Sequence, residues 1–147
     1  MSLKTGIVKD CRYLRHETGP YHPESPRRLE ALYKMLEDPD MKGKFTEIEP
    51  RHATHEEIGM IHQPSYIEMV ARTAGKAHTS LDPDTETSAE SYDVARLAIG
   101  GFCNAIDSVS RGEINNAFAF VRPPGHHAEA GRAAPSINQV KPFWPVF

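Results

Sequence analysis

The residues best suited to chemistry are two adjacent histidines, His126 and His127, within the sequence Arg-Pro-Pro-Gly-His-His-Ala-Glu at 122–129. Imidazole titrates near neutral pH, so a positioned histidine pair suits proton transfer at a reacting carbonyl group. The alternative is that two neighbouring histidines lie in a solvated loop. The context favours chemistry, because the pair follows a stiff Pro-Pro-Gly turn and the apolar run 117–121. A strand ending in such a turn projects side chains into the crevice where open α/β sheets bind ligands.

The elements that must position this pair alternate between predicted strands and predicted helices. Short alternating or apolar runs predict strands at 5–10 and 45–49, and 117–121 is predicted to be a buried parallel strand. The region 76–87 is polar and rich in turn residues. Apolar residues at helical spacing predict four helices: 26–36 with Ser25 as N-cap, 55–61 with Thr54 as N-cap, 64–74, and 88–110.

Two adjacent glycines, Gly100 and Gly101, lie inside the longest predicted helix. Each glycine costs about 1 kcal/mol of helix stability relative to alanine. A close packing contact between this helix and the sheet would explain why that cost is tolerated.

Length, charge and cysteine content limit the classes of function. A chain of 147 residues is long enough for one domain with a real core. The net charge of −3 gives no electrostatic reason to expect nucleic acid or an anionic membrane as partner. No apolar stretch is long enough to span a membrane, and residues 1–10 lack the apolar core of a signal peptide. Cys11 and Cys103 have neither metal-ligand nor disulfide spacing, so we expect reduced thiols in a cytoplasmic protein.

The sequence at 122–129 resembles the tandem-histidine motif of the histone deacetylase and acetylpolyamine amidohydrolase superfamily, in the form typical of its class II and bacterial members. The resemblance covers residues 5 to about 132 and implies the open parallel-sheet, three-layer α/β fold of the arginase/deacetylase type. We expect a truncated form with about three strands and flanking helices in residues 1–132, followed by a divergent apolar tail at 133–147. Three other stretches support the resemblance in the same order along the chain: His22–Leu29, His62–Ile67, and Asp82–Ser88 leading into Ala98–Gly101.

The resemblance implies hydrolysis of an amide by a zinc-bound water, with the metal polarising the carbonyl group. His127 would act first as general base and then as general acid. His126 would assist through hydrogen bonding and electrostatics. Gly125 would let the turn approach the reacting centre closely.

Two further residues receive roles in substrate binding or product release through the resemblance. Arg28 corresponds to an arginine that lines the internal cavity through which acetate leaves. Asp84, with Asp82 as the alternative, lies where the family has a rim acid that holds the substrate's amide N–H. Each also has a structural interpretation, because Arg28 could pair with Glu24 and the aspartates are ordinary turn residues. Three other motif side chains are expected to be structural hydrogen-bonding groups: His22, His62 and Tyr66.

The resemblance ends after Arg132, where the family's glycine-phenylalanine-cysteine and asparagine segment should follow. The chain lacks the Asp-x-His metal ligands, the third metal-binding aspartate, the carboxylates that orient the histidines and the transition-state tyrosine. A catalytic zinc usually needs three protein ligands, and no HExxH motif or Cys/His cluster replaces them. We therefore expect no cofactor in this chain and no meaningful deacetylase activity from it alone.

Three functional hypotheses remain open. The first is a truncated deacetylase-like domain that has lost zinc catalysis and self-associates or binds a ligand such as an acetylated amine. The second is a zinc-dependent amidohydrolase, acting on acetyl-lysine or acetylpolyamines, whose site is completed in trans by another chain. The third is a gene fragment without evolved function. For the first we expect a homo-oligomer formed through an exposed sheet edge, apolar helix faces and the tail 133–147.

Overall fold

The computed structural model describes residues 4–125 and 128–132 of the chain. Its centre is a parallel sheet in the order β2-β1-β5, formed by β1 (Thr5–Val8), β2 (Thr46–Ile48) and β5 (Asn116–Ala119). In the central strand, Gly6 pairs with Thr46 on one side and with Ala117 on the other. The predicted α/β architecture with about three parallel strands is therefore confirmed.

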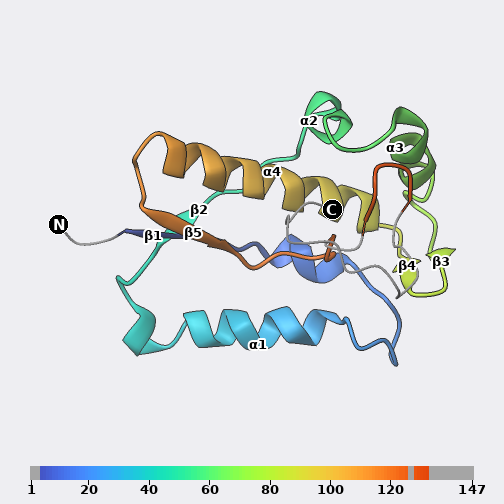
Figure 1. The fold of residues 1–147 in the computed structure, drawn as a ribbon. Helices are drawn as coiled ribbons and strands as arrows, with labels where there is room; N and C mark the ends of the chain where they lie inside the picture. The colour runs from blue at the N-terminus through green and yellow to red at the C-terminus, as the bar shows by residue number, and fades with distance from the viewer. Residues whose placement is uncertain (1–3, 126–127, 133–147) are drawn as a thin grey trace.

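Helices cover both faces of this sheet (Figure 1). The long helix α4 (Ser91–Ser110) lies on one face, and α1 (Pro26–Leu36) lies on the other. Two short helices, α2 (His55–Gly59) and α3 (Pro64–Ala71), come between β2 and α4 in the chain. All four predicted helices are thus confirmed, with small shifts at their ends. In residues 4–125 and 128–132 the remaining helical segments are two 3-10 helices, η1 (Cys11–Arg15) and η2 (Pro39–Met41).

The residues that begin the helices explain where they start. Thr54 and Glu57 form a capping box at α2, in which the Thr54 hydroxyl accepts the Glu57 N–H at 3.2 Å. The Glu57 carboxylate in turn accepts the Thr54 N–H at 2.8 Å. Ser25 is the N-cap of α1, as predicted, but its side chain makes no capping hydrogen bond. The start of α1 therefore depends on Pro26 at the first helical position and on packing.

A second, two-stranded sheet lies at one end of the molecule (Figure 1). Its strands β3 (Thr79–Asp82) and β4 (Thr85–Thr87) pair in the antiparallel direction. These two strands were not predicted, because the region 76–87 is polar and rich in turn residues. The Thr87 hydroxyl donates to the Thr79 carbonyl oxygen at 3.1 Å, which adds to the backbone pairing.

Within the part of the chain that the structure describes, β5 is an edge strand. Its prediction as a parallel strand is confirmed, and its prediction as a buried strand is wrong. Among the described residues it pairs only with β1, and most of its side chains are exposed. Phe118 is 59% exposed, and the centre of its ring lies 4.7 Å from that of Phe120. An apolar side chain on an unpaired edge favours association with another strand or chain.

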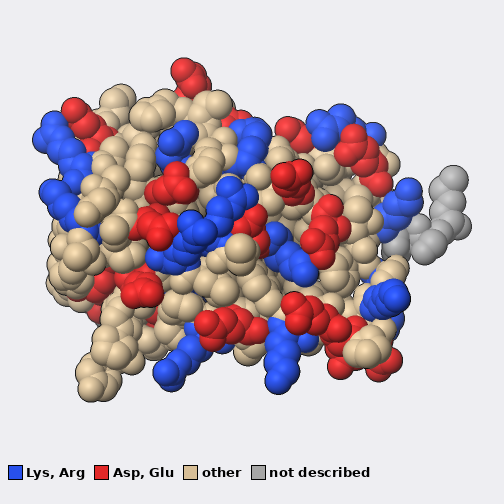
Figure 2. Space-filling model, turned by 180° about the vertical axis from the view of Figure 1, so that it is seen from behind, with Lys and Arg blue, Asp and Glu red and all other residues tan. Residues whose placement is uncertain are grey.

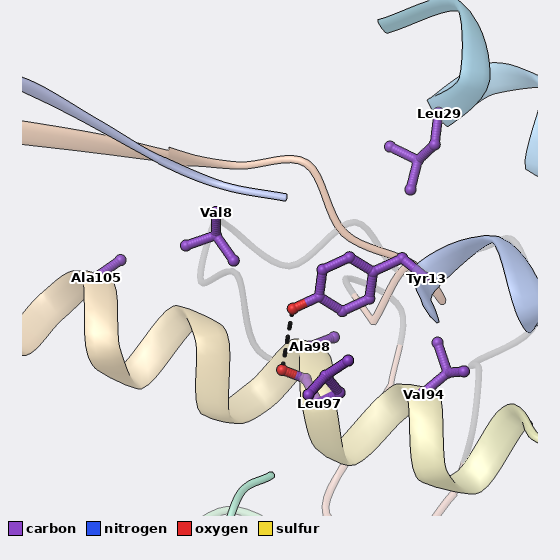
Figure 3. Packing of buried hydrophobic residues seen from close by; sticks show 7 residues of the cluster. All are labelled: Val8, Tyr13, Leu29, Val94, Leu97, Ala98 and Ala105. Carbon is purple, nitrogen blue, oxygen red and sulfur yellow. Dashed lines mark hydrogen bonds between the residues drawn. The ribbon is translucent and has the colours of Figure 1, made fainter. Parts of the chain in front are cut away.

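The core fills the space between α4 and the sheet (Figure 3). Val8 and Tyr13 are fully buried together with Val94 and Leu97 of α4. The Tyr13 hydroxyl donates to the Leu97 carbonyl oxygen at 3.1 Å, and burial raises the pKa of this phenol well above its usual range. The hydroxyl therefore stays protonated and holds η1 against the middle of α4.

Charges of both signs are mixed on the face opposite the view of Figure 1. Figure 2 shows Lys and Arg side chains interspersed with Asp and Glu over this face. The face therefore offers no extended basic surface of the kind that binds nucleic-acid phosphates. Among the helices that the structure describes, none combines the length and the apolar character that a membrane span requires.

Helix α4 approaches the rest of the fold closely at its two glycines. A Cβ atom at Gly101 would lie 2.8 Å from Val8 Cγ1 and 2.8 Å from the Tyr13 hydroxyl oxygen. A Cβ atom at Gly100 would overlap the Arg51 carbonyl oxygen, in the connection that follows β2. The predicted close contact between helix and sheet is confirmed at Gly101, and Gly100 allows a second contact with the polypeptide backbone.

Replacing Gly100 by alanine is expected to destabilise the protein, although alanine is the better helix former by about 1 kcal/mol. The added Cβ meets backbone atoms that cannot rotate away, and overpacking of this kind costs typically about 1–3 kcal/mol. The matched control is Gly59→Ala in α2, where no atom lies within 4 Å of the added Cβ. Urea unfolding should give a lower midpoint for Gly100→Ala only, and equal midpoints for both variants would contradict the close contact.

Candidate functional site

The candidate site is built beyond the carboxyl ends of the parallel strands, which lie at one edge of the sheet. After β5 the chain continues beside β1, since the Phe120 N–H donates to the Val8 carbonyl oxygen at 2.9 Å. The Tyr33 hydroxyl of α1 donates to the Phe120 carbonyl oxygen at 2.9 Å. These bonds fix the direction in which the chain enters residues 122–129.

Arg122, which begins this motif, is almost completely buried, with 2% of its surface exposed. Its Nε and Nη2 atoms donate to the two carboxylate oxygens of Glu24 at 2.6 and 2.7 Å, and Nη1 donates to the His16 carbonyl oxygen at 2.7 Å. Burial alone would raise the pKa of Glu24, but the hydrogen bonds and charge of Arg122 outweigh burial and lower the pKa overall. The pair therefore stays ionised and joins the end of β5 to the loop before α1.

His16 lies beside this ion pair and is itself 4% exposed. Its Nδ1 atom is 2.7 Å from the Ser91 hydroxyl oxygen, and its Nε2 atom is 3.7 Å from a carboxylate oxygen of Glu24. Burial, together with the positive charge of Arg122, lowers the pKa of His16 from 6.5 to about 4. The ring is therefore neutral at pH 7 and serves as a hydrogen-bonding group.

The chain on the other side of the tandem histidines is held by the segment between α2 and α3. The Gln63 N–H donates to the Ala130 carbonyl oxygen at 2.7 Å. The buried His62 ring places Nδ1 2.9 Å from the Glu129 carbonyl oxygen, and burial lowers the pKa of this imidazole. A neutral His62 that donates from Nδ1 explains this contact and agrees with its predicted structural role.

The predicted catalytic residues His126 and His127 lie outside the described residues, so their roles stay predictions. The structure does place their neighbours: the Gly125 carbonyl oxygen accepts the Ala128 N–H at 2.9 Å, which closes a turn. Both flanks of this turn are thus held by residues from the other motifs.

The predicted rim acid Asp84 lies in the turn between β3 and β4. Its side chain lines an open depression of about 550 Å³ together with Tyr21 and His22 of the loop before α1. The alternative, Asp82, accepts the Asp84 N–H at 2.9 Å, which is an ordinary turn interaction. Of the two carboxylates, Asp84 is the one on the wall of this depression, and its contact with substrate remains a prediction.

Arg28 is not enclosed by the described residues, in contrast to the internal cavity implied for it. Its side chain is 63% exposed on α1, and Nη1 lies 3.5 Å from Glu24 Oε1, one turn earlier. This contact is the structural alternative considered for Arg28. The arginine that is buried in this region is Arg122 instead.

Arg122 and His16 had no predicted role, and Glu24 was predicted only as a possible partner of Arg28, although all three lie at the centre of this arrangement. One signal was available for Arg122: it follows an apolar run directly and precedes two prolines. A charged residue in that position is buried only with a partner. No signal of this kind exists for His16, which a single sequence shows only as one histidine among others.

The described residues do not fit a zinc site. No group of three His, Cys, Asp or Glu side chains among them could hold a metal ion. The described side chains hold the imidazoles of His16 and His62 and the carboxylate of Glu24 in place, but they do not supply a metal centre.

Comparison with known proteins agrees with this geometry. Residues 22–134 match the family described as histone deacetylase domain. The chain is 36% identical to histone deacetylase HDA1 of Candida albicans over 90% of its length, and 35% identical to a probable deacetylase of Archaeoglobus fulgidus over 86%. The crystal structure of the HDA15 HD domain superposes on 90% of the chain with a TM-score of 0.84 and 31% identity.

The chain corresponds to only part of each of these proteins. It spans 19% of the Candida protein, 36% of the Archaeoglobus protein and 39% of the HDA15 domain structure. Activities, substrates and partners of the whole relatives therefore do not pass directly to these 147 residues.

The two arginines that contact Glu24 are expected to differ strongly in their effect on stability. Removing the partner of a buried ion pair typically costs about 3–5 kcal/mol, so Arg122→Ala should lower the free energy of unfolding by that order. Arg28→Ala removes an exposed partner and should cost less than about 1 kcal/mol. Urea denaturation of both variants measures the two changes in the free energy of unfolding. Similar decreases in the two variants would show that burial does not distinguish the two ion pairs.

Stability is expected to fall as the pH drops below about 6.5, because the unfolded chain then binds a proton at His16 that the native state excludes down to about pH 4. The loss from this group develops between those two values and reaches at most about 3 kcal/mol. Urea unfolding of wild type and His16→Gln across this range measures it. The difference between the two proteins should shrink as the pH falls, and a constant difference would contradict the proposed neutral state.

Proposed function

Because this chain belongs to the histone deacetylase domain family, we propose that it forms the acid–base part of a deacetylase site and has no deacetylase activity alone. One observation carries the proposal: the segment with the tandem histidines is held on both sides. Arg122 bonds to Glu24 before it, and His62 bonds to the Glu129 carbonyl after it. A turn held in this way suits side chains that must transfer protons in a fixed direction.

In the proposed chemistry His127 takes a proton from the attacking water and returns it to the leaving amine, while His126 assists by hydrogen bonding. Positioned acid–base catalysis of this kind contributes about 10²–10⁴-fold in rate. In the family, zinc supplies the polarisation of the carbonyl group. A zinc centre needs about three protein ligands, and the described residues contain no such group.

The proposed ligand is an acetylated amine. Asp84 on the wall of the open depression would accept a hydrogen bond from the amide N–H of that ligand. Gly125 would allow close approach of the ligand to the turn, and Arg28 would lie on the path of the released acetate. These three assignments rest on the family resemblance.

Self-association is the second part of the proposal. Phe118 is exposed on β5, which has no second strand partner among the described residues, and this supports a homo-oligomer; twofold symmetry is the commonest arrangement. We also propose a cytoplasmic location, supported by the two free thiols at Cys11 and Cys103.

A second candidate function is that of one part of a zinc-dependent amidohydrolase completed by further polypeptide, on another chain or elsewhere on the same one. The observation that favours it is the same edge of β5, together with the 39% coverage of the HDA15 domain structure. A parallel strand from the completing polypeptide would pair with this edge and bring the missing ligands to the end of the sheet.

Activity and zinc content of the purified chain test the proposal. We expect no stoichiometric zinc by mass spectrometry, and no release of acetate from an acetyl-lysine peptide or an acetylated polyamine, because the ligand set is incomplete. Sedimentation should show a discrete oligomer. Zinc uptake at one ion per chain with acetate release would contradict the inactive state, and a heterogeneous aggregate would indicate a fragment without function.

Adding the later part of the Archaeoglobus deacetylase domain separates the two candidates. A gain of acetate release that His127→Ala abolishes, and that the exposed control His55→Ala retains, would support completion by another polypeptide. No gain of activity, or equal activity in the two variants, would remove that candidate.

A further inference from the structure

We infer that Arg122 and Glu24 form a positioning device that sets the direction of the turn carrying the tandem histidines. The inference deepens the proposed function and rests on it, since only a turn with a chemical role needs a fixed direction. Neither residue would touch substrate, so both would act through the residues that follow Arg122.

The contacts of Arg122 define its orientation completely. The planar guanidinium makes a bidentate pair with Glu24 at 2.6 and 2.7 Å and adds a third bond to the His16 carbonyl oxygen at 2.7 Å. Both acceptor residues lie in the connection between η1 and α1, 98 and 106 residues before Arg122. Three bonds in one plane leave the side chain a single direction, which a lysine ammonium would not have.

Stability alone does not account for this pair. A buried ion pair gives little or no net stabilisation over apolar side chains of similar volume, because both charges lose their water. What it does supply is a geometry that apolar packing does not fix as narrowly. We therefore explain the buried charge of Arg122, which is 2% exposed, by the orientation that it gives to the chain and not by a gain in stability.

The residues after Arg122 transmit that orientation. Pro123 and Pro124 have fixed φ angles and no N–H group, so little rotation separates Arg122 from Gly125. On the return side, the Gln63 N–H and the His62 ring hold Ala130 and Glu129. The turn is thus held by a stiff arm at its start and by two hydrogen bonds at its end.

The histidine rings themselves report on the inference, and no deacetylase activity is needed. In protein labelled with ¹⁵N at histidine, NMR gives the tautomer and the titration of His127. Hydrogen exchange gives the protection of the Ala128 amide, which donates to the Gly125 carbonyl oxygen. Arg122→Lys keeps the charge but removes the bidentate geometry, and Glu24→Gln keeps the shape but removes the charge. In both variants we expect altered His127 tautomer populations and exchange at Ala128 faster by about tenfold.

The matched control is Arg12→Lys, which alters another bidentate pair, with Asp10, at 2.8 and 2.7 Å. It should leave the His127 spectrum and the Ala128 exchange rate unchanged. Folded Arg122→Lys or Glu24→Gln protein with wild-type His127 signals would overturn the inference, as would equal effects in Arg12→Lys.

If both variants fail to fold, native-state hydrogen exchange of the wild type in low concentrations of urea tests whether the turn and the Arg122–Glu24 pair open together. The amide of Ala128 should then open together with that of Glu24, as one cooperative unit. Independent opening of the turn at lower urea would overturn the inference. The outcome of the activity assays has no bearing on these measurements, so failure of the proposed function and failure of this inference can be told apart.

Discussion

The rest of the structure depends on the close packing of helix α4 against strand β1 and against the connection that follows β2. Gly101 lets the helix approach Val8 of the central strand, and Gly100 lets the connection after β2 cross directly against it. That crossing is held by the Ala53 N–H, which donates to the Arg96 carbonyl oxygen at 2.9 Å. At Gly100 helix α4 meets backbone atoms of the connection, and at Gly101 it meets the side chains of Val8 and Tyr13, so the positions of β1, of the connection after β2 and of α4 are fixed relative to one another.

The segments that resemble family motifs act mainly as supports in this structure. The His22–Leu29 segment supplies Glu24 to Arg122, and the His62–Ile67 segment supplies bonds to the chain at Glu129 and Ala130. The Asp82–Ser88 segment forms most of a hairpin that places Asp84 beside the loop before α1. Two stretches far apart in the sequence thus hold the chain before and after a single turn, while the third borders the loop before α1.

Local patterns predicted the helices well, while the environment of each element escaped prediction. The capping residues Thr54 and Glu57 act within one helix turn, so the sequence shows them directly. The exposure of β5 depends on which strands lie beside it, and an apolar run in the sequence does not indicate its neighbouring strands. The partnership of Arg122 with Glu24 joins residues 98 positions apart, and no pattern in one sequence says which carboxylate meets which arginine.

The order of the strands has a consequence for the synthesis of this chain. Among the strands that the structure describes, the central strand β1 comes first in the sequence and its neighbour β5 comes last, and the Lys4 N–H donates to the Asn115 side-chain oxygen across 111 residues. At about 5–20 residues per second, β1 leaves the ribosome roughly 6 to 22 seconds before β5 is made. During that interval Ile7 and Val8, buried in the finished sheet, have β2 alone as a strand partner. Chaperones that bind short apolar segments therefore have their best opportunity at Ile7 and Val8 before β5 is made.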